Sequence, residues 1–170
     1  MLEFAREPVG RGIVGGIEVV ADRQVEVGLK RRPRLTAETN PLTMNVFVDE
    51  SALRRTAGSV EIMADQLRHL VEVGQLPNVS IRVVPARVGA YRALMVGAFL
   101  LLEFPPHHTA DLTMPPVVYV QGFLGDLYLE KAEELRQYRD ACVELDRLAL
   151  DEDASRTLIL QVAEEYDGER

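Results

Sequence analysis

Met44-Asn45-Val46-Phe47-Val48 and Val79-Ser80-Ile81-Arg82-Val83-Val84 frame the stretch that decides the fold. Apolar residues recur at every second position in both segments, which is the period of a pleated strand. The residues between them, from Ser59 to Gly74, carry apolar side chains at helical spacing: Ile62, Met63, Leu67, Leu70 and Val71. A helix that joins two strands in this way predicts a βαβ unit whose strands lie parallel.

Further apolar segments extend this unit. We predict strands over Phe99–Phe104, Val117–Gln121 and Leu127–Leu129, and helices over 17–30, over 131–150 and from Asp151 onward. The last two strands form a hairpin-like pair, and residues 86–95 form a loop. The expected fold class is α/β, with α+β as the alternative: a mixed sheet of about five strands flanked by helices, two of them C-terminal.

The domain organisation follows from length and from where the pattern fails. A chain of 170 residues is most simply one domain. Residues 1–16 contain Pro8 and four glycines without a clear period, so we predict a flexible N-terminal arm, then a single α/β domain over 17–166 and a frayed tail over 167–170. The G-x-G-x-x-G at Gly10–Gly15 lacks the preceding strand and the later carboxylate of a dinucleotide-binding loop.

Composition and charge exclude several classes of function. A net charge of −8 argues against direct DNA binding by this chain alone, which requires a concentrated basic face. Cys142 is the single cysteine, so no internal disulfide forms, and its position on a helical apolar stripe predicts a small core residue. No apolar run reaches the ~18 residues of a membrane-spanning helix. We therefore expect a cytoplasmic protein without membrane association.

The sequence contains few residues in patterns that carry chemistry. His107, His108 and Asp111 invite a metal interpretation, but adjacent residues of an extended chain point apart, so we predict a polar loop and no metal site. The serines lack a nucleophile motif or a partner histidine at readable spacing. We expect no cofactor.

Polar residues at strand ends are the candidate ligand-binding residues, because ligands of open α/β sheets collect beyond the carboxyl ends of the strands. Glu50 and Arg54 follow the first strand and are four residues apart, and Gln121 ends a later strand. One interpretation is that Glu50 braces this corner of the fold. The other is that Glu50 and Arg54 contact a polar ligand, with Tyr91 or Tyr119 as an aromatic wall.

The chain resembles the domain of unknown function that follows an Xre-type helix-turn-helix in actinobacterial regulators, the WhiJ-like proteins among them. The resemblance extends over most of 22–163 and rests on these segments: Asp49–Arg55, Gln66-Leu67, His69-Leu70, Pro77–Val79, Val84-Pro85, Gly97–Phe99, Leu102–Phe104, Val118–Val120, Gly125, Leu127–Glu130, Tyr138, Leu145, Ala149-Leu150 and Ser155. Gln121 and Tyr91 stand where that family commonly has Glu and His.

The resemblance implies a partner. The family's helix-turn-helix and its apolar opening segment have no counterpart in this sequence, so we expect an unpaired edge or an uncovered face among the strands from Phe99 to Tyr128. Self-association is the simplest cover, and we expect a homodimer, or a complex with a small protein, in which the 1–16 arm or the final helix crosses between chains.

Two functions remain open. The resemblance implies a non-enzymatic sensor or interaction domain of a regulatory system, which binds a partner protein or a small effector. The alternative is a stand-alone domain recruited to bind or convert a small molecule, for example as a cofactor-independent cyclase or isomerase. A deep, closed apolar pocket would favour the second function, and an exposed apolar patch would favour the first.

Overall fold

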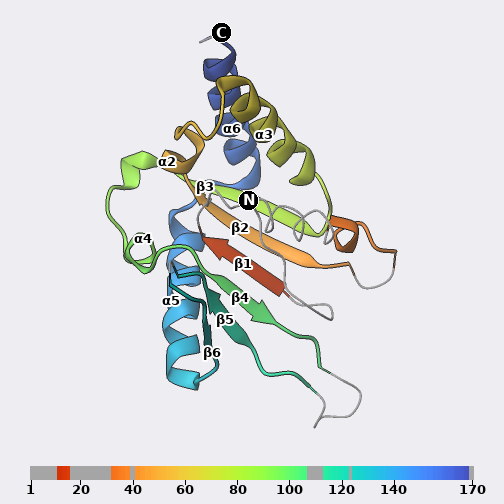
Figure 1. The fold of residues 1–170 in the computed structure, drawn as a ribbon, viewed down its shortest axis with the longest axis vertical. Coiled ribbons are helices and arrows are strands. Elements are labelled where there is room, and N and C mark those ends of the chain that lie inside the picture. The colour runs from red at the N-terminus through yellow and green to blue at the C-terminus, as the bar shows by residue number, and fades with distance from the viewer. Residues whose placement is uncertain (1–10, 16–31, 39–40, 107–112, 123, 169–170) are drawn as a thin grey trace.

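The structure is a computed structural model that describes residues 11–15, 32–38, 41–106, 113–122 and 124–168, with the backbone path alone for 11–15 and 32. The chain folds into a mixed sheet with helices on both sides (Figure 1). The described elements, in chain order, are β1 (Arg11–Gly15), η1 (Arg32–Arg34), β2 (Thr43–Asp49), α2 (Glu50–Leu53), α3 (Val60–Val73), β3 (Val79–Val84), η2 (Ala86–Val88), α4 (Arg92–Val96), β4 (Leu100–Glu103), β5 (Val117–Val120), β6 (Leu127–Leu129), α5 (Ala132–Leu148) and α6 (Glu152–Gly168).

The sheet confirms the predicted α/β class. Its six described strands lie in the order β3-β2-β1-β4-β5-β6. β2 pairs with β3 in parallel, as the βαβ prediction required, and β1 also pairs with β2 in parallel. The pairings β1–β4, β4–β5 and β5–β6 are antiparallel, and the last of them confirms the predicted hairpin-like pair. Helices α5 and α6 are the two predicted C-terminal helices.

Helix α3 shows how local sequence sets an element. The Ser59 side chain accepts a hydrogen bond from the Ile62 N–H at the start of the helix, and Gly74 ends it. Met63, Leu67 and Leu70 are buried, as predicted. Ile62, which the same periodicity assigned to the apolar stripe, is 59% exposed and lies outside it.

The two faces of the sheet carry separate apolar cores. On the first face, Val46, Val48, Ile81 and Val83 pack with residues of α3 and α6, which lie side by side (Figure 1). On the second face, Phe47, Val84, Leu101 and Val118 pack with residues of α4 and α5. Successive strand residues point to opposite faces, so β2 and β3 contribute to both cores.

Two predictions about irregular segments are wrong. Arg11–Gly15 do not belong to an arm, because they form β1 in the middle of the sheet, between β2 and β4. The last five residues of the G-x-G-x-x-G thus lie in a strand rather than in a loop after one. The segment predicted as a loop over 86–95 contains η2 and most of α4. Gly89 and Gly97 flank α4 with φ of 73° and 78°, a conformation that glycine adopts readily.

Some predictions lie outside the described residues: the helix over 17–30, the His107–Asp111 loop, residues 1–10 of the arm and the end of the tail. Within the described part of the chain, no helix is both long enough and apolar enough to cross a membrane.

Candidate functional site

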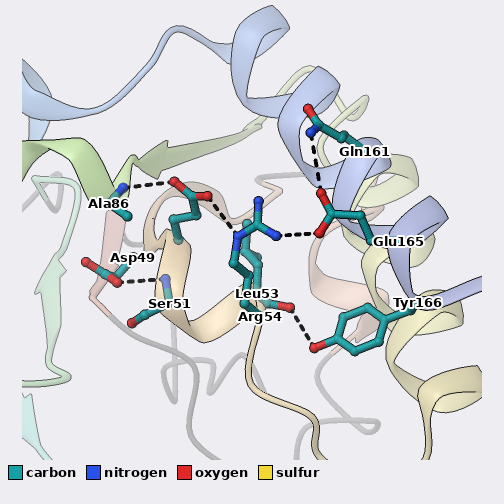
Figure 2. A network of polar contacts seen from close by, with 9 residues as sticks. Asp49, Ser51, Leu53, Arg54, Ala86, Gln161, Glu165 and Tyr166 are labelled. Atoms are coloured by element: carbon teal, nitrogen blue, oxygen red, sulfur yellow. Dashed lines mark hydrogen bonds and ion pairs between the residues drawn. The ribbon is translucent and has the colours of Figure 1, made fainter. Parts of the chain in front are cut away.

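The carboxyl end of β2 holds a network of polar side chains (Figure 2). The Glu50 carboxylate accepts a hydrogen bond at Oε1 from Arg54 Nε, at 2.9 Å, and another at Oε2 from the Ala86 backbone N–H, at 2.8 Å. Arg54 also pairs through Nη1 with the Glu165 carboxylate on α6. The network therefore joins α2, the start of η2 and the end of α6.

Asp49 connects this corner to Tyr91. Its Oδ1 accepts a hydrogen bond from the Ser51 N–H, at 2.9 Å, and so caps the short helix α2. Its Oδ2 accepts a hydrogen bond from the Tyr91 hydroxyl, also at 2.9 Å. A third carboxylate, Glu144 of α5, accepts a hydrogen bond from the Ala93 N–H, so acidic side chains hold the 86–96 segment at three points.

The surroundings fix the charge state of these groups. The hydrogen bond from the Ala86 N–H, assisted by Arg54, lowers the pKa of Glu50. Burial opposes ionisation of Asp49, yet hydrogen bonds from Ser51 and Tyr91 outweigh it, and the pKa of Asp49 is lowered. Burial, followed by the bond to Asp49, raises the pKa of the Tyr91 hydroxyl. At neutral pH both carboxylates are ionised and the phenol is protonated, states that suit structural bonds better than proton transfer.

The five predicted ligand-binding residues do not form one cluster. Glu50 and Arg54 bond to each other, and Tyr91 joins them through Asp49. The strand registers place Tyr119 level with Val46 and three strands away, a separation of about 14 Å. Tyr119 also packs on the first face of the sheet, whereas Tyr91 packs on the second. Gln121 follows directly after β5 and is likewise three strands away from β2.

The geometry therefore matches the bracing interpretation of Glu50, and a ligand role for these residues stays a prediction. Two of the partners were missed at the sequence level. Glu165 lies 111 positions from Arg54, so no local pattern indicated that the two side chains pair. Asp49 was not among the five candidate residues, and its bond to Tyr91 spans a sequence separation that no local pattern reveals.

A shallow hollow lies at the opposite end of β2 and β3. Its volume is about 530 Å³, and it is open to solvent and mostly polar. It is lined by residues of the two strand starts, the α3–β3 turn and the start of α6: 43–45, 74–80, Glu152 and Arg156. Asn78, which lines it, already donates hydrogen bonds to the carbonyls of Leu35 and Leu42, at 2.9 and 2.7 Å. This hollow is unlike the deep apolar pocket expected of a cyclase.

Reactive groups in the described part of the chain have structural surroundings. Cys142 is buried in the core, as predicted, and burial raises the pKa of its thiol to about 12. Within the described ranges, no group of three or more His, Cys, Asp or Glu side chains is placed to hold a metal ion.

The strand β6 presents a second candidate surface, an apolar one. Leu124, Leu127 and Tyr128 are 96%, 56% and 66% exposed, and the Tyr128 ring lies against the Tyr119 ring with centroids 5.2 Å apart. β6 pairs with β5 on one side and ends the described sheet on the other. We call Leu124, Leu127, Tyr128 and the outer backbone of β6 the β6 edge. It fits the expected unpaired edge, and its signal in the sequence was three successive apolar residues, which cannot all point to one buried face.

Comparison with known proteins gives a family without an assigned activity. Residues 4–161 match the family model described as Domain of unknown function (DUF5753). No curated protein and no solved structure matches the chain.

Proposed function

The chain belongs to the DUF5753 family, and from that premise we propose that it is a non-enzymatic interaction domain of a regulatory system, which acts by binding a partner protein. This proposal selects the first of the two functions that the sequence left open. It also specifies a protein, rather than a small effector, as the principal ligand.

The β6 edge is the observation that carries the proposal. Isolated exposed apolar side chains are common on protein surfaces and need no explanation. Leu124, Leu127 and Tyr128, however, lie within five residues of one another at the end of the described sheet, where the outer side of β6 pairs with no other described strand. Apolar side chains beside an open strand edge are typical of surfaces that bind another protein.

The corner around Glu50 supports a structural rather than a catalytic role. Its carboxylates have lowered pKa values and are held by partners within the chain, whereas catalytic acids and bases usually have pKa values moved toward neutrality. The polar hollow beside Asn78 is open to solvent, and the Asn78 side chain that lines it already donates hydrogen bonds to the carbonyls of Leu35 and Leu42. Neither feature favours conversion of an apolar small molecule.

Site-specific photocrosslinking in the source cells tests the proposal. A photoreactive phenylalanine analogue at Leu124 should give one discrete crosslinked protein, which mass spectrometry identifies. The same analogue at Ile62, an exposed apolar position on α3, is the matched control and should not give that product. The purified partner should then bind the purified chain, and Leu124→Asp should weaken binding at least tenfold.

Two results would contradict the proposal. One is the same set of crosslinks from positions 124 and 62, which would indicate random collisions. The other is a purified partner that binds wild type and Leu124→Asp equally.

A further inference from the structure

The charges around the β6 edge indicate what kind of segment it accepts. We propose that β6 receives an extended segment of the partner protein, added as a further strand, in which basic side chains flank a central apolar or aromatic residue. This inference rests on the proposed function and specifies the chemistry of the partner.

Strand addition fits the geometry of β6. β6 ends the described sheet, so the backbone groups on its outer side are placed to pair with another extended chain. Leu127 and Leu129 lie opposite Val120 and Val118, on the α5 side, and Tyr128 lies opposite Tyr119 on the other side. An added strand would therefore meet apolar side chains on both of its faces.

Acidic residues border this edge at both ends. Asp126 precedes β6 and Glu130 follows it, and both are exposed. From Thr113 to Glu130 the sequence contains no Lys, Arg or His. When the strand alternation is continued by one residue at each end, Asp126 and Glu130 fall on the same face as Tyr128. A complementary strand thus carries positive charges two residues before and two residues after the residue opposite Tyr128.

The same charges disfavour a second copy of this chain as the occupant. Two copies of β6 related by a twofold axis pair antiparallel, and pairing centred on Tyr128 places Asp126 of each copy opposite Glu130 of the other. Like charges directly opposite one another destabilise a strand pair. A basic segment converts both repulsive pairs into attractive ones, and the net charge of −8 favours its approach.

Two synthetic peptides test the inference on the full chain. The basic peptide has the core Lys-Val-Tyr-Val-Lys with a threonine at each end, and the acidic peptide has glutamate in place of both lysines. We expect the basic peptide to bind about tenfold more tightly, since both flanking pairs change from repulsive to attractive. NMR should place the largest amide shifts at Leu127–Leu129, with slower amide exchange there on binding.

Charge reversal supplies the matched control. D126K/E130K should reverse the preference between the peptides, whereas D140K/E164K, which changes the net charge equally at exposed helix positions, should preserve it. Circular dichroism checks that both variants fold. If the edge variant does not fold, the peptide preference of the wild type and its weakening between 50 and 500 mM salt decide the matter.

Equal affinity for both peptides, no binding of either, or amide shifts away from β6 would overturn strand addition. The proposed function is tested separately from strand addition. If the crosslinked partner binds in a Leu124-dependent way while the peptides do not, the chain is an interaction domain that recognises its partner by another mode.

Discussion

The two edges of the sheet are finished in opposite ways. At the β3 edge, the Val83 N–H donates to the Ser155 hydroxyl at 2.9 Å, and the Val83 carbonyl accepts from the Leu150 N–H at 2.8 Å. Arg82 adds hydrogen bonds to the carbonyls of Leu150, Ala149 and Asp146. At the β6 edge, Leu127 and Tyr128 are exposed, and Asp126 and Glu130 border the strand.

The two edges should differ in whether they contribute to the stability of the fold or to the binding of a partner. At the β3 edge, the α5–α6 connection and the start of α6 satisfy the backbone N–H and carbonyl of Val83 within the chain, and the apolar side chains of β3 are buried in the two cores. The β6 edge belongs to a three-residue strand with little buried surface of its own. Substitutions near β3 should therefore change the free energy of unfolding, and substitutions near β6 should change binding.

The largest expected effect comes from the helix that covers β3. Ile159 of α6 is almost completely buried in the first core. Ile159→Ala removes buried apolar volume and should lower the free energy of unfolding by about 2–5 kcal/mol. Urea denaturation measures this value. Leu127→Ala on β6 is the control and should change it by less than about 0.5 kcal/mol. Similar losses in the two variants would contradict the difference between the edges.

A smaller effect should follow from removing the hydrogen bond between the Val83 N–H of β3 and the Ser155 hydroxyl. Ser155 is fully buried, and its hydroxyl is the acceptor for the Val83 N–H. Ser155→Ala leaves that buried donor without its partner, which should cost about 1–3 kcal/mol.

Thr157→Ala is the matched control for Ser155, because it removes a hydroxyl from the same helix whose bond to the Asp153 carbonyl is exposed. It should change stability by less than about 0.5 kcal/mol in the same urea titrations. Slow hydrogen exchange at Val83 that persists in Ser155→Ala would show that another group satisfies this N–H.

The contrast between the edges also marks what the sequence could predict. Alternation and helical spacing identified β2, α3 and β3 because each carries its own periodic pattern. β1 was missed: its RGIVG sequence contains two glycines and is a short strand with little pattern of its own. The roles of Ser155 and Glu165 depend on residues 72 and 111 positions away, so they are properties of the assembled fold.

The candidate site was predictable only in part. The four-residue spacing predicted the Glu50–Arg54 pair, and the structure contains it. The grouping with Tyr119 and Gln121 failed as a single cluster, because β1 and β4 insert between β2 and β5. The predicted homodimer stays a prediction, although Arg11–Gly15 cannot be the exchanged segment while they pair within their own sheet.

The polar network around Glu50 should stabilise the contacts among α2, η2 and α6 in a pH-dependent way. Glu50→Gln removes a charged acceptor from Ala86 and Arg54, and Arg54 in turn holds Glu165 of α6. We expect a loss of about 1 kcal/mol at pH 7.

The sign of the pH dependence follows from the lowered pKa of Glu50. Its contribution to stability is complete above the unfolded-state pKa, about 4.3, and is lost as pH falls through the lower folded-state pKa. Urea titrations of wild type and Glu50→Gln should therefore differ at pH 7 and converge as the pH falls through the lowered folded-state pKa of Glu50. A difference that grows on acidification would contradict the ionised, hydrogen-bonded Glu50.

The smallest effect should appear when Asp126 and Glu130, the two charges that border the β6 edge, are neutralised. In D126N/E130Q, a twofold pairing of β6 with β6 no longer places carboxylates opposite one another. Each of the two relieved pairs is worth roughly 0.2–1 kcal/mol, so self-association through this edge should strengthen by about two- to thirtyfold. Sedimentation equilibrium measures the self-association constant, and D140N/E164Q, with the same change in net charge at exposed helix positions, should leave it at the wild-type value.

If the wild type is already a dimer through another surface, the edge variant alone should form larger assemblies. Equal association constants in the two variants would mean that Asp126 and Glu130 do not weaken self-association through β6.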